Sequence, residues 1–241
     1  MTLLYNDTVE LEFTAKGHKY TVNGERVANV TSVLGVMNKP ALVGWAAKET
    51  ALYWENLIPP GRAVMFDEVE IAEHVKSSKS ARFKKSGKAL MVGNIVHEFA
   101  ENYAKGENPS FPTNPQAKAG CEAFLAWWEA HDIEVIAVER KILSLEHGFC
   151  GTVDLICLLD GELTIIDYKT STGFWEEYDI QVAGAYRIAY EEEMGDEVKR
   201  CMVVRFDKET GEFETKEIGE FDAHKEAFLA CLTIYNYQKR K

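Results

Sequence analysis

Two runs of apolar and β-branched residues in the middle of the chain predict a β-hairpin. The first run spans residues 149–159 and the second spans residues 162–168, with Asp160-Gly161 between them. An Asp-Gly pair between two such runs favours a two-residue hairpin turn. Pairing around this turn brings together residues whose numbers sum to about 321. Asp154 is therefore expected to lie opposite Asp167.

The remaining pattern predicts further elements around this hairpin. Residues 11–30 are expected to form a hairpin closed by Asn23-Gly24. The other predicted helices span residues 30–36, 41–56, 67–76, 88–105, 116–131, 175–193 and 221–239, and the other predicted strands span residues 135–145, 199–206 and 212–218. This order predicts an α/β fold in which helices flank a mixed central sheet. We expect one compact domain, with an N-terminal hairpin and helical elaboration over residues 1–80 and a core over residues 81–241.

Charged residues on the central hairpin share one face. Side chains alternate along a strand, so Asp167 and Lys169 point to the side that Asp154 also faces, and Tyr168 points away. An isolated Asp-X-Lys triplet is usually a surface ion pair. Here it follows Ile165-Ile166, and charges are rarely placed in such runs without a partner. A Mg²⁺ or Mn²⁺ ion would relieve the repulsion between the carboxylates, bind a phosphate oxygen and activate water.

A histidine in the predicted helix over residues 88–105 is a further candidate ligand. Apolar residues recur there at three- and four-residue steps, and His97 falls at the edge of their stripe, beside Gly93. A lone histidine at a core edge is usually structural. Edge placement also suits a ligand that faces a cleft, and the downstream acids favour that interpretation.

The pattern Gly151-X-X-Asp154 followed by Asp167-X-Lys169-Thr170 resembles the PD-(D/E)XK nuclease superfamily, most closely its RecB-like exonucleases. The resemblance implies a restriction-endonuclease-like fold. It also implies a metal site made by His97, Asp154, Asp167 and the backbone carbonyl of Tyr168, with Lys169 assisting the attacking water.

Two second-tier residues also come from this resemblance. Glu139 resembles an acid on the first core strand and would be an outer ligand of the metal or water. Gln181 resembles the glutamine of a glutamine–tyrosine motif and would orient Lys169 or a phosphate. The family spaces that pair four apart, whereas Gln181 and Tyr186 are five apart, and an α-helix would not place them on one face. We therefore assign Gln181, and not Tyr186, to the site.

The beginning of the chain resembles phage-encoded members of the same branch. The matching segments are residues 18–20, 23–24, 30–34 and 40–42, with Trp45. They suggest a phage or prophage enzyme acting in the host cytoplasm in DNA recombination, repair or processing. A recombinase or a single-strand-annealing protein is the partner that this context implies, and an oligomer is compatible with it.

Charge gives a mixed indication about nucleic acid. The net charge of −12 opposes binding to a phosphate backbone. Between Glu73 and Glu98, however, the chain has no carboxylate. The basic residues in this segment are Lys76, Lys79, Arg82, Lys84, Lys85 and Lys88. They form the predicted DNA-binding track, and the alternative is a solvated basic face with no ligand.

Composition excludes several classes of protein. The chain has 241 residues, 46% of them hydrophobic, enough for a sizeable core. No apolar run is long enough to span a membrane and no signal peptide is evident, which predicts a cytoplasmic protein. Five cysteines without a close pair indicate reduced thiols and no iron–sulfur cluster, unlike the cluster-bearing branch of the same nucleases.

These observations predict a Mg²⁺- or Mn²⁺-dependent DNA exonuclease that hydrolyses phosphodiester bonds without a covalent intermediate. One alternative is a structure-selective endonuclease of the same superfamily. The other is a catalytically silent nucleic-acid-binding module. The motifs leave open the direction of digestion, the choice between DNA and RNA, and the preference for single or double strands.

Overall fold

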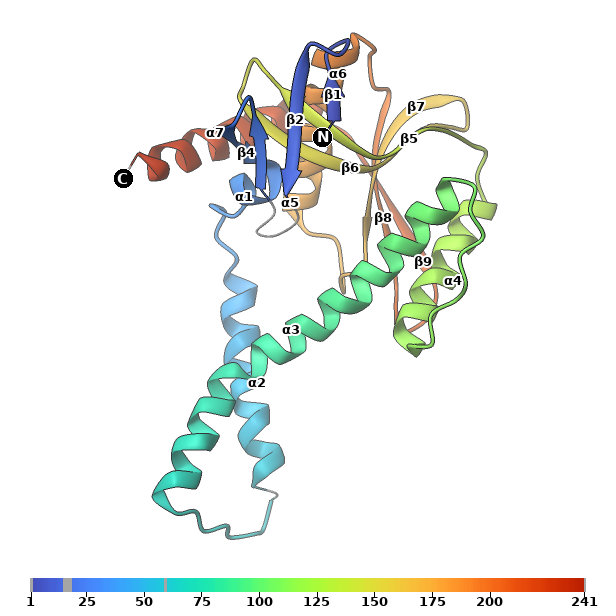
Figure 1. The fold of residues 1–241 in the computed structure, drawn as a ribbon. Helices are drawn as coiled ribbons and strands as arrows, with labels where there is room; N and C mark the ends of the chain where they lie inside the picture. The colour runs from blue at the N-terminus through green and yellow to red at the C-terminus, as the bar shows by residue number, and fades with distance from the viewer. Residues whose placement is uncertain (1, 15–18, 59, 241) are drawn as a thin grey trace. The chain divides into compact units, whose positions relative to one another are not determined.

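A computed structural model describes residues 2–14, 19–58 and 60–240 of the chain (Figure 1). The chain divides into two compact units. Unit 1 comprises Met1–Met37 and Ile95–Lys241, and unit 2 comprises Asn38–Asn94. The predicted domain boundary after residue 80 stays a prediction. His18, which belongs to the phage-like N-terminal motif, lies outside the described residues.

Unit 1 is built on a mixed sheet in which the described residues form nine strands. Their order is β1-β2-β3-β4-β6-β7-β8-β9, and β5 pairs with the other edge of β6. The strands are β1 (Thr2–Leu4), β2 (Val9–Thr14), β3 (Lys19–Val22), β4 (Glu25–Asn29), β5 (Ile133–Ser144), β6 (Phe149–Leu159), β7 (Glu162–Lys169), β8 (Arg200–Phe206) and β9 (Phe213–Ile218). The β4–β6 and β7–β8 pairs are parallel and the other pairs are antiparallel.

Strand β6 is a branch point of this sheet. Strand β5 pairs along the whole of one edge of β6, from Phe149 to Leu159. On the other edge, β4 pairs with Phe149 and Cys150, and β7 pairs with β6 from Leu155 onward. The edge between Cys150 and Leu155 therefore lies where β4 and β7 diverge. That stretch contains Asp154.

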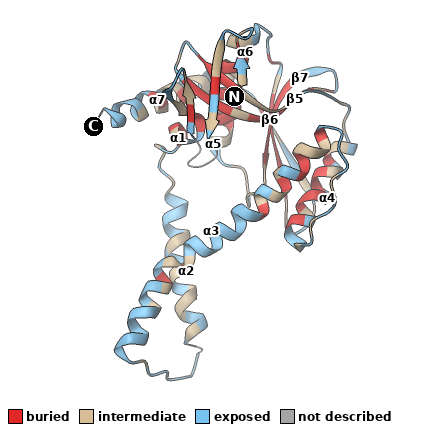
Figure 2. Cartoon of the chain, in the orientation of Figure 1, coloured by how far each residue is buried: buried red, intermediate tan, exposed pale blue. Residues whose placement is uncertain are grey.

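Helices cover both faces of the unit 1 sheet (Figures 1 and 2). The end of α3 (Glu68–Ala104) and helix α4 (Pro115–Glu129) pack on one face through an aromatic cluster centred on Phe124 and Trp127. The opposite face carries the remaining helical segments of the unit, which share a core with Ile156 and Ile165. These segments are α1 (Val30–Leu34), α5 (Glu176–Asp179), the π-helix η1 (Ile180–Tyr186), α6 (Arg187–Met194) and α7 (Phe221–Lys239). The predicted fold class, a mixed sheet flanked by helices, is confirmed.

The central hairpin has the predicted register. Leu159 pairs with Glu162 and Leu155 with Ile166, so the two residue numbers in each pair add up to 321, as predicted. Asp160 and Gly161 both have positive φ, at 52° and 85°. Positive φ at both central residues is what a type I′ turn requires, and Gly is well suited to the second position. The Asn23-Gly24 turn between β3 and β4 has the same property, with φ of 51° and 80°.

Two predictions about the elements were wrong. The N-terminal region contains the additional strand β1, and β2 begins at Val9. The two helices predicted over residues 67–76 and 88–105 are one helix, α3 (Glu68–Ala104). The serine hydroxyls in the intervening segment bond back to the helix itself, for example Ser78 Oγ to the Val75 carbonyl at 3.0 Å. They therefore do not compete with the helix for its backbone hydrogen bonds.

Unit 2 is a helical hairpin formed by α2 (Pro40–Leu57) and the first part of α3. Its contacts include a hydrogen bond between Tyr53 Oη and His74 Nδ1 at 2.8 Å and an ion pair between Lys85 and Glu49 at 2.6 Å. Trp54 packs edge-on against the His74 ring. Among the described residues, no helix is both long and apolar enough to cross a membrane.

Candidate metal centre and active site

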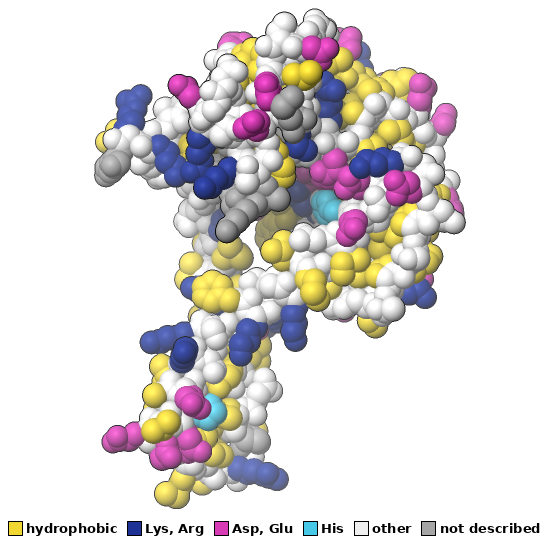
Figure 3. Space-filling model, viewed as in Figure 1, with side chains coloured by type: hydrophobic (Ala, Val, Ile, Leu, Met, Phe, Trp, Pro, Cys, Tyr) yellow, Lys and Arg dark blue, Asp and Glu magenta, His cyan; other side chains and the backbone are white. Residues whose placement is uncertain are grey.

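A cavity of about 220 Å³ opens in unit 1 beside the branch point of β6. Of the residues predicted for the site, all but Tyr168 and the basic segment line this cavity: His97, Glu139, Asp154, Asp167, Lys169 and Gln181. They come from α3, three strands and η1, so residues distant in sequence meet in one place. Figure 3 shows acidic side chains gathered around a histidine on this face of the molecule.

Three of these residues form a group with the geometry of a metal site. One potential ligand atom from each of His97, Glu139 and Asp154 lies within 4.8 Å of the other two. His97 Nδ1 is 3.6 Å from Asp154 Oδ1. Asp154 Oδ2 accepts a hydrogen bond from the backbone N–H of Tyr168 at 2.7 Å, which fixes the orientation of the carboxylate. His97, predicted at the edge of its helix stripe, is partly exposed and faces the cavity.

Glu139 is held in this group by an unusual backbone conformation. Its φ is 50°, in the left-handed region that residues other than glycine rarely adopt. A bulge between Val135 and Ala137 precedes it on β5. Residues on either side of Glu139 pair with residues on either side of Asp154, so the register places the two acids opposite each other. Such strain costs about 1–3 kcal/mol and is often found where a side chain is aimed at a functional site.

Asp167, Lys169 and Gln181 form a second, adjacent group. The Lys169 ammonium forms an ion pair with the Asp167 carboxylate. Gln181 Nε2 donates to Asp167 Oδ1 at 3.0 Å, and Gln181 Oε1 lies 3.5 Å from Lys169 Nζ. Asp167 and Lys169 lie on the predicted face of β7 and line the same cavity. The role of Asp167 as a metal ligand stays a prediction.

The prediction that Gln181 and Tyr186 would not share a helical face was wrong. Gln181 Nε2 donates to Tyr186 Oη at 2.6 Å. The two residues lie in η1, a π-helix, in which the hydrogen bonds join residues five apart. A five-residue spacing therefore brings their side chains together. The glutamine–tyrosine pair is present, in a wider helix than the α-helix assumed from sequence.

Gly151, the glycine of the predicted motif, lets Tyr186 approach the sheet. A Cβ atom on Gly151 would lie 2.9 Å from Tyr186 Cε1 and 3.2 Å from Val30 Cγ2. Neither distance leaves room for a side chain. The glycine thus permits η1 to pack closely on β6, which places Gln181 next to Asp167.

Burial and like charges set the protonation of the carboxylates. Burial, reinforced by the charge of Asp154, raises the pKa of Glu139 to about 7. Burial raises the pKa of Asp167 to about 6, although the Lys169 charge opposes this effect. Burial also opposes ionisation of Asp154, but His97 and Lys169 outweigh it and hold its pKa below the ordinary value. Burial therefore disfavours the ionised forms of Glu139 and Asp167, and a bound cation would favour them.

The residues present fit a divalent cation. The two carboxylates suit Mg²⁺ and Mn²⁺, and the imidazole at coordination distance from them suits a first-row divalent metal. Burial and the Asp154 charge raise the pKa of Glu139, and a nearby divalent cation would oppose both effects. Lys169 lies beside these donors as a positive group that can act on an anionic substrate.

Besides Gly151 and Tyr186, five residues that line the cavity were not predicted to belong to the site: Tyr20, Asn29, Val30, Thr31 and Thr152. Tyr20 Oη and Thr152 Oγ1 are 2.7 Å apart. Thr152 lies two positions before Asp154 on β6, and alternation along the strand could have identified it. Tyr20, Asn29 and Thr31 come from the N-terminal elements. Their contribution depends on the β4–β6 pairing, for which the sequence carries no local signal.

The other predicted residues lie elsewhere. The Tyr168 ring is buried on the opposite face, against Trp127 and Phe206. Its carbonyl as a metal ligand stays a prediction. The six basic residues of the predicted DNA track all belong to unit 2 and are exposed. One of them, Lys85, forms the ion pair with Glu49.

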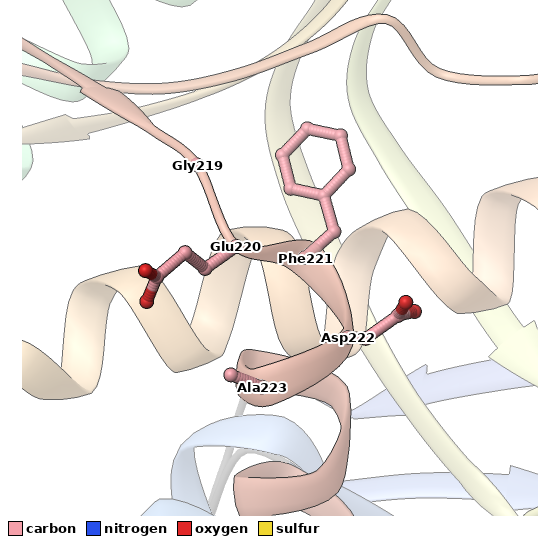
Figure 4. Close-up of a pocket in the computed structure, with 5 residues that line it drawn as sticks. All are labelled: Gly219, Glu220, Phe221, Asp222 and Ala223. Carbon is pink, nitrogen blue, oxygen red and sulfur yellow. The ribbon is translucent and has the colours of Figure 1, made fainter.

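A second hollow, lined by residues 219–223, lies at the beginning of α7. In Figure 4 the Glu220 and Asp222 side chains point away from each other. The hollow therefore lacks converging polar groups of the kind that the β6 cavity has.

No protein-family model and no curated protein matches the chain. Among solved structures, the chain is similar to an alkaline exonuclease, LHK-Exo, from Laribacter hongkongensis, with 15% identity and a TM-score of 0.30. That match covers 60% of this chain and 90% of the other. LHK-Exo in complex with dAMP matches with 17% identity and a TM-score of 0.29, over 61% and 83% of the two chains. At these TM-scores the similarity carries no argument about family or activity.

Proposed function

We propose that the protein is a divalent-metal-dependent DNA exonuclease that hydrolyses phosphodiester bonds. The observation that carries this proposal is the convergence of His97, Glu139 and Asp154 beside the Asp167–Lys169 pair in one cavity. Carboxylate ligands next to a lysine suit a reaction in which a bound metal ion and the Lys169 ammonium both contact an anionic substrate. The sequence resemblance to the PD-(D/E)XK nucleases supports the same chemistry.

His97, Glu139 and Asp154 would hold the cation, with Asp167 as an adjacent ligand. When bound, a Mg²⁺ or Mn²⁺ ion would neutralise charge on the phosphate and lower the pKa of the attacking water. Asp154 is prepared for this role because its carboxylate is already oriented by the Tyr168 N–H. His97 must be neutral to bind, and its pKa, which burial lowers and Asp154 raises, lies above the ordinary value. Metal binding would therefore compete with protonation of His97.

Lys169 would act directly on the reacting groups. Its Nζ can donate a hydrogen bond to the attacking water or to the phosphate oxygen on which charge develops. Burial lowers the pKa of Lys169, but Asp167 and Asp154 more than compensate, so the ammonium stays charged. Gln181 holds Asp167 from the other side and so keeps the lysine aimed into the cavity.

A comparison of linear and closed circular DNA tests this proposal. With Mg²⁺ or Mn²⁺, the purified protein is expected to release nucleotides from end-labelled linear DNA, to leave closed circles intact and to stop when EDTA is added. If the protein cuts the closed circle, the proposed activity would be that of a structure-selective endonuclease and not of an exonuclease. Binding of DNA without metal-dependent hydrolysis would point to a catalytically silent binding module.

A further inference from the structure

An exposed phenylalanine lies within the basic segment of unit 2. The Phe83 side chain is 61% exposed, although large apolar residues are usually covered. The Arg82 guanidinium lies over its ring, 4.5 Å from the centroid. No carboxylate occurs in the sequence between Glu73 and Glu98. The ring is therefore surrounded along the helix by cations.

Helix geometry places Phe83 on the side of α3 that faces away from α2. His74 and Lys85 contact α2 residues through Tyr53 and Glu49. At about 100° per residue, these two contacts lie roughly opposite Phe83 on the helix. By the same geometry the residues within about 60° of arc around Phe83 include Lys76, Lys79, Gly87 and Leu90. Phe83 thus has no packing role in the hairpin core.

Arg82 lies over the ring, whereas the space one turn further along the helix, at Gly87, is open. A Cβ atom built on Gly87, one turn after Phe83, would meet nothing within 4 Å. Lys79 and Lys76, one and two turns before the ring, are exposed. A flat group could lie on the ring while an attached chain of phosphates contacts the lysines. This combination of a ring and a row of cations is what sequence-tolerant binding of single strands uses.

We propose that Phe83, with Lys76 and Lys79, is a stacking platform for unpaired bases of single-stranded DNA. This inference rests on the proposed function and adds its substrate class, a DNA end with a single-stranded segment. Duplex DNA would gain little from the ring because its bases are already stacked on each other. Unpaired bases expose their faces, and every base has one, so the platform needs no particular sequence.

Fluorescence anisotropy with labelled oligo-dT and with a duplex of equal length tests the platform. EDTA is included so that binding is measured without hydrolysis. Phe83→Leu keeps apolar bulk but removes the ring, and it is expected to weaken oligo-dT binding about tenfold. Phe83→Trp is expected to retain the wild-type affinity. Duplex affinity is expected to change less than about twofold in both variants, because the phosphate contacts remain. Leu90→Ala, on the same exposed face, is the matched control and should leave both affinities unchanged.

Unchanged oligo-dT affinity in Phe83→Leu would overturn the inference, as would an equal loss on duplex. Phe83 is exposed, so these variants should fold, and circular dichroism checks that they do. Metal-dependent hydrolysis by the wild type is measured separately. If the wild type hydrolyses DNA but Phe83→Leu binds oligo-dT as the wild type does, the platform is rejected and the proposed nuclease function is retained. If Phe83→Leu binds oligo-dT more weakly but the wild type hydrolyses no DNA, the platform is retained and the nuclease function is rejected.

Discussion

Glu139 combines backbone strain, burial and unfavourable charge at a single residue. Its left-handed φ of 50° is costly, and burial together with Asp154 raises its pKa to about 7. The packing of β5 and β6 maintains this arrangement. The Glu139 carboxylate is unfavourable for folding when it carries its charge without a partner. A bound cation would pair with that charge and so stabilise the folded protein.

We therefore predict that Glu139→Gln weakens Mn²⁺ binding by at least about tenfold. The amide keeps the shape of the side chain but removes its charge. Isothermal titration calorimetry with MnCl₂ measures the effect.

Glu101→Gln is the matched control for this substitution. Glu101 lies on α3 near the site but forms its ion pair with Lys105. The affinity of the Glu101→Gln variant for Mn²⁺ should stay close to that of the wild type. Equal affinities in the wild type and Glu139→Gln would remove Glu139 from the metal site.

The candidate site could be predicted from sequence where alternation along strands decides the geometry. Asp154, Asp167 and Lys169 share a cavity because side chains alternate on paired strands of known register. Glu139 was predicted only as a second-tier residue, from the family resemblance, and its φ of 50° departs from regular strand geometry. A sequence pattern carries no signal for such a local departure.

At the scale of elements, η1 determines how the site is supported. The backbone hydrogen bonds of a π-helix span five residues instead of the four of an α-helix, and η1 places Gln181 and Tyr186 on one face. Gln181 in turn holds Asp167. Asp167 in turn pairs with Lys169, so the π-helix helps to orient the lysine through Gln181 and Asp167.

Tyr186→Phe is predicted to lower the free energy of unfolding by about 1 kcal/mol, because one buried hydrogen bond is lost. Urea denaturation measures this change. Tyr190→Phe, on the same helical run, is the comparison, since the Tyr190 ring contacts Arg140 and lies outside the cavity lining. A larger loss for Tyr190→Phe than for Tyr186→Phe would contradict the assigned role of the Gln181–Tyr186 bond.

Glu192 of α6 holds the turn after β1 and the turn after β5 in unit 1. Its Oε1 accepts hydrogen bonds from Tyr5 Oη at 2.7 Å and from the N–H groups of Leu145 and Glu146 at 2.8 and 3.0 Å. Burial raises its pKa, but the hydrogen bonds, including one with Ser144, outweigh burial and leave the pKa below the ordinary value. A lowered folded pKa contributes stability above the unfolded pKa of about 4.3, and this contribution is lost as pH falls through the folded value.

We predict that Glu192→Gln lowers the free energy of unfolding by about 1 kcal/mol at pH 7 and that the difference from the wild type shrinks as the solution becomes acidic. Urea unfolding at several pH values measures it. Glu176→Gln, at an exposed position on α5, is the control and should have little effect at any pH. A difference for Glu192→Gln that stays constant down to acidic pH would contradict the linkage.

The elements were predictable where turns and periodicity are local. Strand β6 and helix α7 begin and end where they were predicted, and the Asp160-Gly161 turn fixed the hairpin register. The sequence predicted two helices where α3 is continuous. Serines usually weaken a helix prediction, but those of α3 bond back to the helix, which the sequence does not reveal. The β4–β6 pairing joins segments far apart in sequence and depends on tertiary packing.

At the scale of the whole molecule, charge is divided between the two units. The carboxylates that would hold a metal lie in unit 1, whereas the carboxylate-free basic segment lies in unit 2. The net charge of −12 is therefore compatible with the proposed DNA binding, because the local potential along the basic segment is positive. Chemistry and substrate binding are expected to be separable by substitutions in the two units.

The central claim is that Lys169 and the adjacent acids form a hydrolytic site. The most direct test is the initial rate of Mg²⁺-dependent nucleotide release from linear DNA by the wild type, Lys169→Ala and Lys141→Ala. Lys141 lies on β5 with its ammonium near the Phe13 ring, outside the cavity lining, and controls for the loss of one positive charge. We predict that Lys169→Ala lowers the rate about 10²–10³-fold while Lys141→Ala retains it. Undiminished release by a folded Lys169→Ala variant would contradict the account.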